Sequence, residues 1–135
     1  MTPNTIQAKT AMLIRKPVAE VFEAFINPDI TTRFWFTKSS GRLAVAKPNQ
    51  RIVIEWPGYG GRTTVEWRFL RQTEGTTFVS ISESGFTGDE EGVLNAVVNS
   101  TQGFSFVLAA LKALLEHNIR LALVADRHPN GIAEP

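Results

Sequence analysis

The chain contains no cysteine and only two histidines, His117 and His128. The lack of cysteine excludes disulfides, thiol catalysis and thiolate metal sites. The two histidines stand far apart, one at the end of an expected helix and one in the tail, with no third imidazole to join them. We therefore expect no metal site and no cofactor, and His117 instead suits the negative end of a helix dipole.

The chain also lacks a long apolar run and an excess of charge of either sign. Its longest purely apolar run, residues 106–111, is too short to span a bilayer, and residues 1–10 lack the apolar core of a signal peptide. Fourteen basic and thirteen acidic residues leave a formal charge of +1, which does not favour nucleic-acid binding. We expect a cytoplasmic protein that binds neither nucleic acid nor membrane.

What is present is ordinary for a folded domain. The 135 residues are 43% hydrophobic and 20% charged, enough to build a hydrophobic core. We expect one domain over residues 1–135, with its core at about 5–118 and a C-terminal tail at 119–135.

The pattern of residues 88–117 predicts one long helix, around which the rest of the fold is expected to be built. Asp89 is the expected N-cap, with two glutamates in the first turn. Apolar residues and one threonine recur at spacings of three and four, the period of one helical face: Leu94, Val97, Thr101, Phe104, Leu108, Leu111 and Leu115. The polar residues expected on the solvent side are Asn95, Asn99, Gln102, Lys112 and Glu116. Such a helix is about 40 Å long, so a curved sheet must bury it.

The rest of the chain predicts strands and two short helices. Four segments alternate with the period of a strand: residues 6–14, 51–56, 63–70 and 77–83. A short strand is expected over residues 36–43, before a turn at residues 47–50. Pro17 suits the first position of a helix whose apolar face is Val18, Val21, Phe22, Phe25 and Ile26. Asn27 and Pro28 end it and begin a second helix.

The sequence pattern does not determine the secondary structure of the C-terminal tail. The alternation of Ile119, Leu121 and Leu123 leaves open an extended tail or a further helical turn. The end of the chain, from Arg127 on, is expected to fray.

The order of these motifs resembles a known family. The segments that carry the resemblance are residues 14–25, 27–28, 33–35, 64–67, 76–81, 84–86, 103–104 and 108–115. Together they resemble the branch of the START/Bet v 1 (SRPBCC) superfamily that contains activators of the heat-shock protein 90 ATPase. The resemblance implies an α+β helix-grip fold: a curved antiparallel sheet around a long C-terminal helix, two short helices after the first strand, and an apolar cavity between sheet and helix.

One departure from the family concerns the sheet. Family members usually carry further strands before the segment resembling Pro48-Asn49, whereas residues 41–46 lead there directly here. The sheet is therefore expected to be shortened by a hairpin. A shortened sheet would leave an open edge that can pair with a second chain, which favours a homodimer.

The cavity that the resemblance implies would have a large, apolar lining. The residues expected around it are Met12, Phe25, Trp35, Trp56, Trp67, Phe69, Ile81, Phe86, Phe104, Leu108 and Leu111. The alternative is that these side chains pack on one another as ordinary core. A lining of this kind suits a small hydrophobic or aromatic ligand, so the leading hypothesis is a protein that binds or carries such a ligand without catalysis.

Glu83 is the carboxylate nearest to the inner face by alternation. A buried acid among indole rings can act as a general acid or base. We favour the alternative, an exposed residue at a strand end, because glutamate is rarely buried. Two other functions stay open: a co-chaperone-like interaction module with a chaperone partner, which the resemblance alone implies, and an enzyme of the cyclase or hydrolase kind that uses Glu83.

Overall fold

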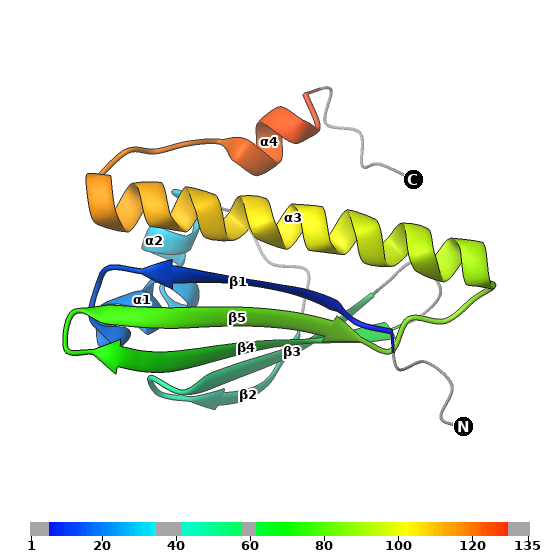
Figure 1. Cartoon of the computed structure of the whole chain (residues 1–135), viewed down its shortest axis with the longest axis horizontal. Coiled ribbons are helices and arrows are strands. Elements are labelled where there is room, and N and C mark those ends of the chain that lie inside the picture. The colour runs from blue at the N-terminus through cyan, green and yellow to red at the C-terminus, as the bar shows by residue number, and fades with distance from the viewer. Residues whose placement is uncertain (1–5, 35–41, 58–61, 130–135) are drawn as a thin grey trace.

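The computed structural model describes residues 6–34, 42–57 and 62–129, and in this part of the chain a sheet lies against one long helix (Figure 1). The elements in chain order are β1 (Ala8–Ile14), α1 (Val18–Ile26), α2 (Pro28–Thr31), β2 (Arg42–Lys47), β3 (Arg51–Pro57), β4 (Arg62–Thr73), β5 (Thr76–Ser84), α3 (Glu90–His117) and α4 (Leu123–Arg127). The strands form one antiparallel sheet in the order β1-β5-β4-β3-β2, so β1 and β2 are its edges. This is the α+β architecture predicted from the sequence.

Alternating burial in the strands confirms the predicted inner face. In β4, Val65, Trp67 and Phe69 are buried between more exposed neighbours. In β5, Val79 and Ile81 are likewise buried between more exposed neighbours. They pair with Phe69 and Trp67 of β4, respectively. Inward side chains of adjacent strands therefore stand side by side and form one continuous apolar surface.

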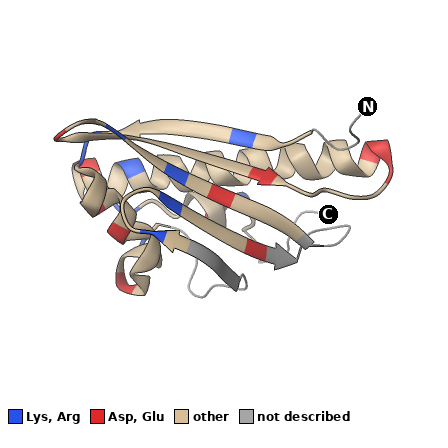
Figure 2. Ribbon diagram, turned by 90° about the horizontal axis from the view of Figure 1, so that it is seen from below, with Lys and Arg blue, Asp and Glu red and all other residues tan. Residues whose placement is uncertain are grey.

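The outer face of the sheet carries charges of both signs beside exposed apolar residues such as Leu70 and Phe78. Figure 2 shows segments of Lys and Arg interspersed with segments of Asp and Glu on the strands. Glu66 of β4 forms ion pairs with Arg51 of β3 and, at 3.2 Å, with Arg68 of its own strand.

The two short helices α1 and α2 form where the sequence predicted them. Pro17 precedes the first helical residue, Val18, and the Asn27 side chain caps α2 by accepting the backbone N–H of Asp29 at 3.0 Å. Pro28 begins α2, where its missing N–H costs nothing. One detail was wrong: Ile26, placed on the apolar face of α1, is exposed.

The long helix α3 has the predicted ends. Asp89 accepts the N–H of Gly92 at 2.7 Å, and Asn118 ends the helix in the left-handed conformation. By length and hydropathy this helix would suffice to cross a membrane, but its buried face packs on the sheet as a core helix. The predicted apolar stripe needs one correction, because Leu94 is 48% exposed. The buried face is rotated, and it includes Val93, Ala96 and Val107.

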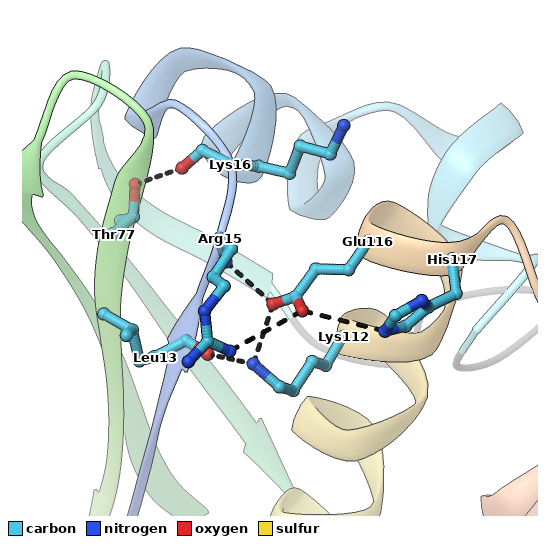
Figure 3. Close-up of polar contacts among 7 residues, drawn as sticks. All are labelled: Leu13, Arg15, Lys16, Thr77, Lys112, Glu116 and His117. Carbon is cyan, nitrogen blue, oxygen red and sulfur yellow. Dashed lines mark hydrogen bonds and ion pairs between the residues drawn. The ribbon is translucent and has the colours of Figure 1, made fainter.

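Lys112 and Glu116, expected on the solvent side of α3, instead bind the edge of β1. Lys112 donates to the backbone carbonyl of Leu13, and Glu116 accepts the backbone N–H of Arg15, both at 2.7 Å. Figure 3 shows the Glu116 carboxylate enclosed by Arg15 and Lys112. Two backbone groups at this end of β1 are thus occupied by side chains of α3.

The second edge strand lies later in the chain than predicted. The sequence placed a strand over residues 36–43, whereas β2 spans Arg42–Lys47, and residues 36–41 lie outside the described part. The turn that follows is confirmed, with Gln50 donating its N–H to the carbonyl of Lys47 at 3.0 Å. Asn49 takes a positive φ there, which asparagine tolerates well.

The tail folds back on α3. Residues 119–122 have no regular structure, and α4 then lies on the side of α3 away from the sheet (Figure 1). Leu123 and Val124 of α4 pack against the core. Arg127, where fraying was expected to begin, is the last helical residue and donates to the Gln102 side chain at 2.6 Å.

Candidate functional site

The space between the sheet and α3 is the place where the sequence predicted a ligand. Two hydrophobic clusters lie there. We call them the main cluster, which joins α1, β3, β4, β5 and the C-terminal half of α3, and the minor cluster, which is formed by Ala8, Phe86, Val93 and Ala96 with Val97 at its side.

Most of the predicted ligand residues lie in the main cluster. Those buried there or packed against it are Met12, Phe25, Trp67, Phe69, Ile81, Phe104, Leu108 and Leu111. Phe86 belongs to the minor cluster. Trp35 and the side chain of Trp56 lie outside the described part of the structure.

The aromatic side chains of the main cluster pack edge to face on one another. Trp67 and Phe104 have ring centroids 5.9 Å apart at an interplanar angle of 85°, and Phe25 contacts Phe34 at 5.5 Å and Phe69 at 5.7 Å. Such contacts are typical of a well-packed core. The alternative considered from the sequence, that these residues serve as core, therefore describes this half of the interior.

Glu83 lies on the boundary between the two clusters. On one side it pairs with Ala8 of the minor cluster, and on the other with Val65 of the main cluster. The sequence interpretation that we favoured, an exposed strand-end residue, was wrong, because Glu83 is only 4% exposed. Strict alternation carries it inward two residues beyond Ile81, and in this strand alternation outweighs the usual preference of glutamate for the surface.

A buried threonine holds one oxygen of the Glu83 carboxylate. Thr63 of β4 donates its hydroxyl to Glu83 Oε2 at 2.5 Å. The other oxygen, Oε1, is buried and has no hydrogen-bond partner within the described residues. Sequence reasoning did not single out Thr63, although the inward alternation of Val65 and Trp67 extends back to it.

Along α3, Gly103 lies between the residues of the minor cluster and those of the main cluster. It lies seven residues, close to two helical turns, from both Ala96 of the minor cluster and Ala110 of the main cluster, so the three share one side of α3. Apart from its chain neighbours and the adjoining backbone of α3, a Cβ atom built on Gly103 would meet no atom of the described residues within 4 Å. We call Glu83, Thr63 and Gly103 together the junction.

Hydroxyl groups tie α3 to β1 beside the junction. Thr10 and Ser105 are hydrogen bonded through their side chains at 2.8 Å, and Ser105 also donates to the carbonyl of Thr101. These hydrogen bonds place polar side chains between β1 and the middle of α3. Within residues 6–34, 42–57 and 62–129, no group of three or more His, Cys, Asp or Glu side chains is placed to hold a metal ion.

No protein-family model matches the chain, and no curated protein matches it. Solved structures do. Protein SSP2350 from Staphylococcus saprophyticus is 23% identical, with a TM-score of 0.73 over 87% of this chain and 99% of its own. CalU16 from Micromonospora echinospora, in its solution structure, is 18% identical, with a TM-score of 0.73 over 95% of this chain and 73% of its own. The Aha1 dimer from Colwellia psychrerythraea is 14% identical, with a TM-score of 0.68 over 84% of this chain and 98% of its own.

At these identities the likeness shows the fold. It confirms the helix-grip arrangement of START/Bet v 1 type that the order of the motifs implied. The narrower resemblance, to activators of the heat-shock protein 90 ATPase, stays a prediction. A function must accordingly be argued from the interior of this chain and its junction.

Proposed function

We propose that this protein binds a small, largely apolar molecule between its sheet and the N-terminal half of α3, and that it does not catalyse a reaction. The observation that carries the proposal is the free space for a side chain at Gly103. A Cβ atom there would meet no atom of the described residues within 4 Å apart from the adjoining helix, and the same side of α3 carries Ala96 and Ala110 of the two clusters. Ligand sites in proteins are concave and mostly apolar, with a few polar groups that orient the ligand. The junction has this composition.

Binding fits the junction better than catalysis. Glu83 and Thr63 are its polar side chains, and within the described part of the chain they are hydrogen bonded to each other without a histidine, lysine or second acid. Acyl transfer and hydrolysis need a nucleophile paired with a base, and general acid–base catalysis commonly needs a second polarising group. A single held carboxylate is suited to orienting a ligand.

Native mass spectrometry tests this proposal. The protein as purified, and after incubation with 2-naphthylmethanol, should show an added mass that disappears on denaturation. The variant Gly103→Phe would fill the open space with a ring and should lose that mass. Leu94→Phe places the same ring on an exposed position of the same helix and should retain it. An absence of added mass in wild-type protein under both conditions, or its retention in Gly103→Phe, would contradict the proposal.

A second candidate function is protein–protein interaction. Its support is the likeness to the Aha1 dimer, together with the resemblance of the sequence to activators of a chaperone ATPase. Light scattering after size exclusion should then give twice the chain mass of 14.9 kDa. A monomer with a bound small molecule would favour the first proposal.

A further inference from the structure

We infer that the molecule bound at the junction carries a protonated amine, and that the carboxylate of Glu83 is the partner of that amine. The inference rests on the proposed function and adds the chemical class of the ligand: an apolar or aromatic body with one ammonium group. It is carried by the geometry of Glu83 and Thr63.

Only one of the two oxygens of the Glu83 carboxylate has a hydrogen-bond donor within the described residues. Thr63 is itself buried, and its hydroxyl fixes Oε2. Oε1 has no hydrogen-bond donor in the described ranges. A buried carboxylate oxygen without a donor is costly, since it has lost its hydration and gained nothing in exchange. A bound donor would remove this cost.

The missing partner is a cation rather than a neutral donor. Buried carboxylates in proteins are normally paired with Arg, Lys or a metal ion. Yet the direct cross-strand neighbours of Glu83 are Ala8 and Val65, and no Lys, Arg or His of the described residues lies within ion-pair distance. A neutral hydroxyl would supply a hydrogen bond but leave the charge uncompensated, whereas an ammonium supplies both.

The apolar residues around Glu83 indicate the chemistry of the remainder of the ligand. The cross-strand neighbours of Glu83, Ala8 and Val65, are buried apolar residues, and each belongs to one of the two clusters. An inorganic cation would find a single carboxylate and a hydroxyl there, too few oxygens for a metal site. An amine with an aromatic or branched aliphatic body matches both the acid and the apolar walls.

A matched pair of probes tests the inference. 2-Naphthylmethylamine and 2-naphthylmethanol share one apolar body and differ in the ammonium group, which is charged at pH 7. Calorimetric titration of the wild-type protein should give a Kd at least about tenfold lower for the amine, the usual size of a charge-assisted hydrogen bond. In Glu83→Gln this ratio should fall to about one, while the Kd of the alcohol should change little.

Two further variants separate charge from structure. Glu74→Gln removes the same charge from an exposed turn and should leave the ratio unchanged. Thr63→Val removes the hydroxyl that holds Oε2 and should lower the ratio, whereas Thr63→Ser, which keeps the hydroxyl, should restore it. Near-ultraviolet circular dichroism checks that each variant is folded.

The outcomes distinguish this inference from the proposed function. Equal affinity of the wild-type protein for the two probes, or a preference for the alcohol, would overturn the inference and leave the proposed function standing. A preference for the amine that survives in Glu83→Gln would also overturn it. Failure of both probes to bind the wild-type protein would overturn the two together.

Discussion

Glu116 in the last turn of α3 accepts the backbone N–H of Arg15 at 2.7 Å, which ties the end of the long helix to the end of the edge strand β1 (Figure 3). The Glu116 side chain is only 8% exposed, and it also accepts from Lys112 at 2.7 Å. Burial by itself would raise the pKa of Glu116. The hydrogen bonds from Lys112 and Arg15, with the positive charges of both side chains, outweigh burial and lower the pKa.

This lowered pKa predicts acid sensitivity. A carboxyl group with a lower pKa in the folded state stabilises that state above its ordinary value of 4.5, and the contribution is lost as the pH falls through the lowered value. Glu116→Gln should cost about 1–3 kcal/mol of unfolding free energy at pH 7. Urea unfolding at pH 7 and in steps below pH 4.5 measures both effects.

The difference between wild type and Glu116→Gln should shrink at the lowest pH, where the wild-type group is protonated. Glu74→Gln, in an exposed turn, is the control and should track wild type throughout. A constant difference between wild type and Glu116→Gln at all pH values would show that the ionised carboxylate does not provide the stability.

Two glycines of α3 should respond differently to alanine. Gly103→Ala should stabilise the protein by up to about 1 kcal/mol, because alanine is the better helix former and its Cβ has open space. At Gly92 a Cβ would lie 2.9 Å from Asp89 Oδ1, the oxygen that caps the helix. In Gly92→Ala, the stability gained from the better helix former should therefore be offset by the weakened Asp89 cap. Thermal unfolding of both variants measures these effects. A larger increase in stability for Gly92→Ala than for Gly103→Ala would contradict the geometry.

Two leucines that the sequence placed on one stripe of α3 should differ in their contribution to stability. Leu108 is fully buried in the main cluster, so Leu108→Ala should cost about 2–5 kcal/mol. Leu94 is largely exposed, and Leu94→Ala should stay within about 0.5 kcal/mol of wild type. Equal losses in urea unfolding would mean that the helix is rotated relative to this structure.

The folded-back tail should add stability through α4. Leu123 packs against the main cluster, and Leu123→Ala should lower the unfolding free energy by about 1–2 kcal/mol. Leu121, two residues earlier, is exposed, and the same substitution there should have little effect. If both variants unfold like wild type, α4 does not stay on α3 in solution.

The candidate site was predictable only in part. The sequence placed Trp67, Ile81 and Leu108 in the interior, either as ordinary core or as the lining of a cavity, and they are buried in the main cluster. It found Glu83 by alternation and then preferred the surface for it. The general preference of glutamate for the surface takes no account of a hydrogen-bond donor on the neighbouring strand, such as the hydroxyl of Thr63.

The sequence by itself determined the type and order of most elements, because period, caps and turn residues act over a few neighbouring positions. Asp89, Asn27 and the alternation in β4 and β5 are of this kind. Only the tertiary structure decided which side of α3 faces the sheet, that Lys112 and Glu116 bind the edge of β1, that α4 folds back, and that Glu83 meets Thr63. Each of these depends on residues far apart in the chain, and the relative rotation of packed elements is fixed by the packing of all their side chains together.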